Sequence, residues 1–150
     1  MLKLRKNKKG FTLVELIVVI AIMAVLAGTI AGVTVSQLNK QTDKTAYGEI
    51  ATLATALDAY LSGEDVDATN FKGKVSAWIT EYNTEHNNAL INTGTAAPKA
   101  GTHSFLVVVS TETNKNEVTF SFTPKSSSSK SSRTYEYNEK THSISEKSSS

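Results

Sequence analysis

Cysteine is absent from the sequence of 150 residues. Its absence excludes disulfide frameworks, thiolate zinc sites and thiol catalysis. The three histidines, His86, His103 and His142, are scattered and form no paired metal-binding motif. The sequence also lacks a nucleophile elbow, a phosphate-binding loop and a dinucleotide fingerprint. We therefore expect a protein that is not an enzyme and that holds neither a cofactor nor a metal ion.

Charge is unevenly distributed along the chain. The first ten residues contain five of the 16 basic residues and no acidic one, which leaves 11 basic residues against 14 acidic residues in the rest. The body beyond residue 10 is therefore slightly acidic, and a general nucleic-acid-binding surface is not expected. The five basic residues are Lys3, Arg5, Lys6, Lys8 and Lys9.

Residues 11–35 form one long apolar run, FTLVELIVVIAIMAVLAGTIAGVTV, whose only charge is Glu15. As a helix it would extend about 37 Å, which is enough to cross the ~30 Å hydrocarbon core of a bilayer. The basic flank places residues 1–10 in the cytosol and the body outside. A cleaved secretory signal is the alternative, but its apolar part is usually shorter, about 7–15 residues.

Glu15 is unusual because a carboxylate inside a membrane segment is costly and generally has a functional partner. It lies five residues after Gly10, in the segment Gly10-Phe11-Thr12-Leu13-Val14-Glu15, between a short basic leader and the apolar run. This arrangement resembles the signal of type IV prepilins and type II secretion pseudopilins. The resemblance covers roughly residues 1–35.

The resemblance implies a role for each matching residue. A prepilin peptidase would cut between Gly10 and Phe11 on the cytosolic side and N-methylate Phe11. Glu15 would then pair with the Phe11 amine of a neighbouring subunit in an apolar bundle. The implied partners are the prepilin peptidase, identical or related pilin subunits, and an assembly platform with its ATPase, the last acting indirectly.

Small residues recur every four positions in the apolar run, at Ala24, Gly28 and Gly32. Such spacing allows helix backbones to approach closely. We therefore expect these three positions to pack against neighbouring helices.

The rest of the chain predicts an α+β head. Apolar residues at helical spacing continue the stem helix over residues 36–61, with Ser62-Gly63 ending it. A second helix is predicted over 74–90 with Trp78 in the core, and residues 64–70 form an acidic loop that only faintly resembles a calcium-binding loop. Strands are predicted over 103–111, 116–123, 133–138 and 141–145, and the serine-rich segments should be loops.

These expectations define a fold class and four segments. We expect a long N-terminal helix, half membrane-spanning and half amphipathic, packed against a small antiparallel sheet of three or four strands. The segments are a removed leader (1–10), a transmembrane and filament-core helix (11–35), its amphipathic continuation (36–61) and a globular head (62–150).

The expected function is that of a structural subunit of a type IV pilus-like filament. Its location would be the cell membrane before processing and the cell surface afterwards. A pseudopilin of a secretion or DNA-uptake system is the alternative in the same class, and only a DNA-uptake filament would contact nucleic acid. An alternative of another class is a single-pass membrane protein whose head binds a ligand without polymerising. The lack of cysteine and the serine-rich head favour a Gram-positive bacterial source.

Overall fold

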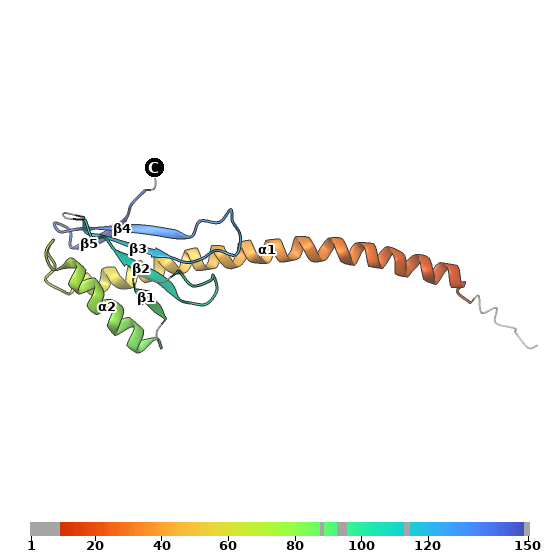
Figure 1. Cartoon of the computed structure of the whole chain (residues 1–150), viewed down its shortest axis with the longest axis horizontal. Helices are drawn as coiled ribbons and strands as arrows, with labels where there is room; N and C mark the ends of the chain where they lie inside the picture. The colour runs from red at the N-terminus through yellow and green to blue at the C-terminus, as the bar shows by residue number, and fades with distance from the viewer. Residues whose placement is uncertain (1–9, 88, 93–95, 113–114, 149–150) are drawn as a thin grey trace, which may run out of the picture. The chain divides into compact units, whose positions relative to one another are not determined.

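The computed structural model describes residues 10–87, 89–92, 96–112 and 115–148. The chain divides into two compact units, residues 1–37 and residues 38–150. The first helix, α1 (Leu13–Ser62), contributes to both units (Figure 1). Each unit is described separately below.

Among the described residues of the first unit, α1 is the only helix or strand. Every side chain described from residue 10 to residue 37 is exposed, although most of these residues are apolar. The hydroxyls of Thr29 and Thr34 donate to the carbonyls of Leu26 (3.0 Å) and Ile30 (2.8 Å). These two polar groups are therefore satisfied within the helix, as a segment surrounded by lipid requires.

In the second unit the C-terminal part of α1 buries one stripe of side chains, and these follow the predicted spacing. The helix ends at Ser62, where Ser62 Oγ donates to the Asp58 carbonyl and the Gly63 N–H donates to the Tyr60 carbonyl. The prediction that Ser62-Gly63 ends the helix is confirmed. Tyr60 is half-buried, and the buried stripe consists of Ala46, Ile50, Leu53, Ala54, Leu57 and Leu61.

The second helix, α2 (Phe71–Glu85), starts and ends earlier than predicted. It starts early because the Asp67 carbonyl already accepts the Phe71 N–H (3.0 Å), which forms the first turn. It ends early because Asn87 adopts a left-handed backbone (φ 53°), so the expected continuation to residue 90 was wrong. Trp78 is in the core, as predicted.

Five strands form one sheet in the order β1-β2-β3-β4-β5. Strands β2 to β5 pair antiparallel with one another, whereas β1 pairs with β2 in parallel. The α+β layout is confirmed, whereas the expectation of three or four strands, all antiparallel, was wrong because it missed β1. The strands are β1 (Leu90–Asn92), β2 (Phe105–Val109), β3 (Glu117–Ser121), β4 (Ser132–Asn138) and β5 (Ser143–Glu146).

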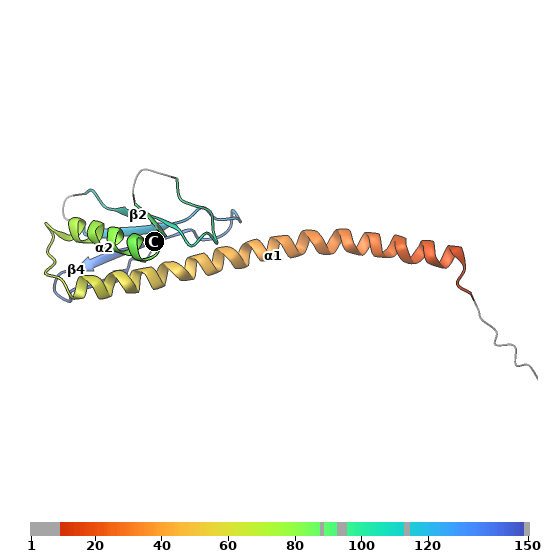
Figure 2. The same ribbon diagram turned by 90° about the horizontal axis from the view of Figure 1, so that it is seen from below.

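One face of this sheet carries the core. Along β2, Phe105, Val107 and Val109 are buried, whereas Val108 between them is 39% exposed. Helix α2 covers the buried face, where Trp78 meets Phe120 edge to face and Phe71 stacks on Tyr137. The second half of α1 contributes to the same core, and Figure 2 shows both helices on the same side of the sheet.

Two carboxylates of α1 hold the head, one binding the loop after β3 and the other binding strand β5. Asp43, 1% exposed, accepts the backbone N–H groups of Lys125 and Ser126, both at 2.8 Å. Asp58 accepts the N–H of Ile144 at 2.7 Å. The two aspartates are 15 positions apart, about 22 Å along the helix, so they fix the sheet to α1 at two separated points.

Candidate processing and assembly site

The start of α1 is closed by a reciprocal pair of side chains, Thr12 and Glu15. The Glu15 N–H donates to Thr12 Oγ1 at 3.2 Å, while Glu15 Oε2 accepts both the N–H and the hydroxyl of Thr12 at 2.9 Å. This is a capping box, in which two otherwise unpaired donors at a helix start are satisfied by side chains. The pair fixes the Glu15 carboxylate beside the Phe11–Thr12 segment.

Only one oxygen of the Glu15 carboxylate is used in this way. Within the described part of the chain, Oε1 accepts no hydrogen bond and Glu15 forms no ion pair. Glu15 shares a shallow groove with apolar side chains, among them Phe11, Val14 and Val18. The site thus presents a free carboxylate oxygen within an apolar surface.

The predicted cleavage junction is accessible. Gly10 is exposed, and the Phe11 side chain is 91% exposed. The basic residues of the leader, Lys3 to Lys9, lie outside the described residues. Among the described residues of the first unit, none packs over Gly10 or Phe11 in a way that would block an enzyme cutting before Phe11.

The predicted helix-packing positions are unobstructed in the single chain. A Cβ atom built on Gly28 or Gly32 would meet nothing within 4 Å. No contact of the described chain therefore requires glycine at either position. The predicted contacts of Ala24, Gly28 and Gly32 with neighbouring helices remain a prediction.

A long exposed apolar surface follows the junction. It contains large aliphatic side chains that are each about half exposed or more, although such residues are normally buried in water-soluble domains. Helix α1 is long and apolar enough to cross a membrane. The surface runs from Phe11 to Leu38 and includes Leu16, Ile17, Ile20, Ile22, Met23, Leu26, Ile30, Val33 and Val35.

The head contains no metal-ligand cluster among the residues that the structure describes. In the acidic loop, Asp67 Oδ1 accepts the N–H groups of Thr69 and Asn70, and Glu64 pairs with Lys74. Hydrogen bonds with the loop hold the pKa of Asp67 below its ordinary value, the Thr69 hydroxyl contributing most. Asp67 and Glu64 therefore serve local loop and helix contacts.

The three histidines have separate partners. His103 Nδ1 is 3.1 Å from Glu49 Oε1, His142 Nδ1 is 3.3 Å from the Tyr137 hydroxyl, and His86 stacks on Tyr82. The structure does not bring them together.

Two residues of structural importance escaped the sequence analysis. Thr12 has a visible signal, because a threonine three residues before a glutamate at a helix start is the spacing of a capping box. Asp43 has none, because a lone aspartate on an amphipathic helix ordinarily faces water. Its partners, at residues 125 and 126, are distant in the sequence.

Comparison with known proteins identifies the N-terminal segment. Residues 5–31 match the family model of the prokaryotic N-terminal methylation motif. The chain carries a type IV prepilin-type signal. The match includes Gly10, Phe11 and Glu15, and it extends through Gly28 in the apolar helix. No curated protein and no solved structure matches the chain.

The prepilin-type signal fits the architecture described above. A pilin or pseudopilin subunit requires an apolar N-terminal helix that is anchored in a membrane before assembly, and the first unit supplies such a helix. Together the signal and the α+β layout confirm the family resemblance and the fold class inferred from the sequence.

Proposed function

We propose that this chain is a structural subunit of a type IV pilus-like filament, cut by a prepilin peptidase and polymerised through residues 11–35. One observation carries the proposal. The matched prepilin-type signal is directly followed by an exposed apolar helix whose first turn holds Glu15. Such a surface is stable in lipid or against other apolar helices, but not in water.

Cleavage prepares the subunit for this exchange. Hydrolysis of the Gly10–Phe11 bond adds the hydroxyl of water to the Gly10 carbonyl and leaves a free amine on Phe11. An α-amine has a pKa near ~8 and is largely positive at neutral pH. The same cut removes five basic side chains that bind the inner leaflet. N-methylation of Phe11 by the peptidase retains the positive charge.

Assembly then joins two charges that are each costly in an apolar bundle. The Phe11 amine of one subunit pairs with Glu15 of its neighbour, and the unoccupied Oε1 is the acceptor. Removing one partner would leave the other charge unpaired at low dielectric, which is strongly destabilising. The Thr12 contact holds Oε2 and so orients the carboxylate for its neighbour.

Close packing of the helices supplies the remaining contacts. Ala24, Gly28 and Gly32 allow backbones to approach, since a neighbour meets no side chain at the glycines. Related subunits, an assembly platform and, indirectly, its ATPase complete the set of partners. The head lies outside the cell, and the Gram-positive source remains a prediction from composition.

The N-terminus of the mature protein tests the proposal. Mass spectrometry of material from the native cell should show a chain that begins at N-methylated Phe11. Gly10→Leu should block the cut, whereas Gly10→Ala, the smallest change, should be the better tolerated of the two. A chain that keeps Met1 in a cell with an active prepilin peptidase would refute the proposal and favour the single-pass, ligand-binding alternative.

Neighbouring genes distinguish the two systems within the filament class. Genes for a secretion channel or a DNA-uptake apparatus beside this one would assign it to a pseudopilus. Genes for a retraction ATPase and other pilins would assign it to a pilus.

A further inference from the structure

Three segments of the second unit meet where α1 enters it. Asp43 of α1 accepts the N–H groups of Lys125 and Ser126 from the loop between β3 and β4. The loop that precedes β2 joins them, because the Thr123 N–H donates to the Pro98 carbonyl at 2.7 Å. Figures 1 and 2 show both loops beside the same stretch of α1. The three segments are residues 38–44, 96–104 and 122–131.

Positive charge is concentrated in these segments. With histidine counted as neutral, they contain five basic residues and one acidic residue, whereas the rest of residues 38–150 contains six basic residues against twelve acidic ones. The head is therefore positive at this end and acidic elsewhere. The five basic residues, called the lysine patch below, are Lys40, Lys44, Lys99, Lys125 and Lys130.

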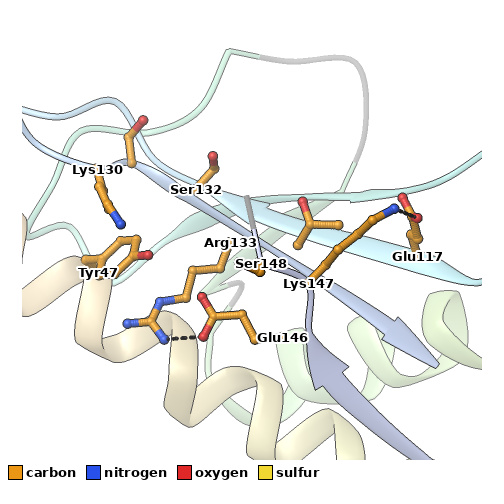
Figure 3. A pocket seen from close by; sticks show the side chains of 10 residues that line it. Tyr47, Glu117, Lys130, Ser132, Arg133, Glu146, Lys147 and Ser148 are labelled. Atoms are coloured by element: carbon orange, nitrogen blue, oxygen red, sulfur yellow. Dashed lines mark hydrogen bonds and ion pairs between the residues drawn. The ribbon is translucent and has the colours of Figure 1, made fainter. Parts of the chain in front are cut away.

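The lysine patch is not neutralised by the described chain. All five side chains are exposed, and within the described residues none of them forms an ion pair. The only acid among them, Asp43, is 1% exposed and accepts backbone N–H groups. The nearby sheet differs, since Arg133 pairs with Glu146 at 3.1 Å. Lys147 likewise pairs with Glu117, and Figure 3 shows both pairs. Like charges left unpaired repel one another, so folding alone does not favour the patch.

The lysine patch begins just after the predicted membrane-spanning segment, which ends at Val35. Lys40 and Lys44 follow Val35 by about 8 and 14 Å along the axis of α1. The headgroup layer of a bilayer extends about 5–8 Å beyond the hydrocarbon core, and charges act across a Debye length of about 8 Å at physiological salt. Both lysines therefore lie within range of lipid phosphates.

The three loop lysines lie close to these two. The Lys125 N–H donates to Asp43, which is next to Lys44 in the sequence. Lys130 lines a small depression together with Lys44. Lys99 forms an isolated bridge with the strand two residues before Lys125. The fold thus adds three charges from distant parts of the sequence to the two on α1.

We propose that the lysine patch binds anionic phospholipid headgroups and so docks the head on the outer face of the membrane before assembly. The inference rests on the membrane-anchored stage of the proposed function. The ligand is a phosphate diester, which a lysine ammonium binds as a point charge. Each lysine near an anionic surface strengthens binding about fivefold. A lipid surface fits better than a nucleic acid, because the patch adjoins a membrane segment and the rest of the head is acidic.

Amine labelling of single lysines tests the proposal on the full chain in vesicles. One set of vesicles contains phosphatidylcholine, and the other contains equal parts of phosphatidylcholine and phosphatidylglycerol. A membrane-impermeant amine-reactive ester labels only outward-facing heads, and mass spectrometry reads each lysine. The lysine patch should label about fivefold more slowly in the anionic vesicles. Equal labelling of the patch in both vesicle types would overturn the proposal.

Two internal controls belong to this measurement. Lys72 and Lys140 are exposed and unpaired within the described chain but lie outside the patch, so they should label equally in both vesicle types. At about 1 M salt, where the Debye length is about 3 Å, the protection of the patch should disappear. Slower labelling of all lysines alike, or protection that persists at high salt, would contradict docking through the patch.

A double variant shows whether the lysines act together. Lys99→Gln with Lys130→Gln removes two charges from exposed positions and should fold normally. In anionic vesicles Lys125 should then label nearly as fast as in neutral ones, because its docked state is weakened about 25-fold. Lys72→Gln with Lys140→Gln makes the same charge change elsewhere and should leave Lys125 protected. Equal labelling of Lys125 in the two double variants would refute the assignment.

Other anions are tested in the neutral vesicles at physiological salt. Inorganic phosphate that protects the patch as well as the anionic lipid does would indicate a discrete anion site. A DNA duplex that protects the patch when phosphatidylglycerol does not would indicate a nucleic-acid surface. Either result would overturn the headgroup proposal.

Flotation of the vesicles separates this inference from the proposed function. A chain that floats with both vesicle types and shows no protection of the patch would refute headgroup docking but leave the filament-subunit proposal intact, since neither cutting nor polymerisation enters the measurement. A chain that floats with neither would refute the membrane anchoring on which both depend.

Discussion

At the scale of single residues, Asp43 shows how one carboxylate organises a distant loop. It is buried on α1 and accepts two backbone N–H groups from the segment that leads into the serine-rich loop. Burial raises the pKa of Asp43, but hydrogen bonds from the Lys125 N–H, the Ser129 hydroxyl and the Ser126 N–H, together with the Lys125 charge, outweigh it. The pKa of Asp43 is therefore lowered.

Asp43→Asn should lower the free energy of unfolding by about 1–3 kcal/mol, because the buried side chain keeps one acceptor oxygen and one of the two backbone N–H groups loses its acceptor. The difference from the wild type should also depend on pH. Since the folded pKa lies below the ordinary value of ~3.9, the stabilisation is complete above that pH and disappears as pH falls through the folded pKa. Denaturant unfolding of both proteins at pH 7 and under increasingly acidic conditions checks this.

Asp65→Asn is the control for Asp43→Asn. Asp65 is exposed, and its change to asparagine should leave stability within about 0.5 kcal/mol of the wild type. A comparable loss in both variants would mean that the loop contacts of Asp43 contribute no specific stabilisation.

Glu15→Gln tests the charge pairing at the assembly site. The amide can still accept the Thr12 contacts, so the helix start should persist. Because a neutral group cannot neutralise the neighbour's amine, we expect normal insertion and cutting but greatly reduced filament yield, measured by shearing and immunoblotting of cells that lack the wild-type subunit. Wild-type yield from this variant would show that assembly does not need the carboxylate.

At the scale of secondary-structure elements, the sheet has two unequal faces. Neighbouring residues of β2 demonstrate this, since Val107 is fully buried and Val108 is 39% exposed. Val107→Ala should cost about 2 kcal/mol of stability through lost burial and a cavity. Val108→Ala should cost less than about 1 kcal/mol. Thermal or urea unfolding of the pair measures the difference, and equal losses would contradict a core confined to one face.

The glycine positions of α1 belong to the same scale. Gly28→Leu places a large side chain where the single chain has open space, so the monomer should remain helical in detergent. Filament yield should fall, because neighbouring helices can no longer approach. Gly28→Ala adds only one methyl group and should assemble better than the leucine variant. If Gly28→Leu forms filaments as well as the wild type does, Gly28 does not lie at a close helix contact.

The elements differ in how well their sequences predict them. Helix α1 was predictable because its apolar spacing is sustained and Ser62-Gly63 marks its end. Strand β1 was not, because it has three residues and its partner β2 begins more than ten residues later. The start of α2 depends on the hydrogen bond from the Phe71 N–H to the Asp67 carbonyl, and its end depends on the left-handed backbone of Asn87. Neither feature is visible in the spacing of the apolar residues.

The candidate functional residues likewise differ in how well the sequence predicts them. Gly10, Phe11 and Glu15 form a local motif, so they were identifiable from the sequence. Lys44, Lys99 and Lys125 come together only because two loops pack beside α1, and nothing in their sequence spacing points to a shared surface.

At the scale of the whole molecule, the two units have opposite solvent requirements. The described residues of the first unit, from residue 10 to residue 37, expose their apolar side chains, whereas residues 38–150 contain the buried core. We expect a fragment of residues 38–150 to be a soluble, folded monomer and the full chain to need detergent. Gel filtration and circular dichroism of both check this, and an aggregated or unfolded fragment would show that the head depends on the first unit.

The pair of aspartates on α1 also bears on how the head responds to force. Asp43 holds one end of a helix segment to the loop after β3, and Asp58 holds its other end to strand β5. A pull along α1 would act on both attachments as shear and would strain them together instead of peeling the sheet away contact by contact. The segment from Asp43 to Asp58 should therefore resist tension more strongly than its few hydrogen bonds would if they broke one after another.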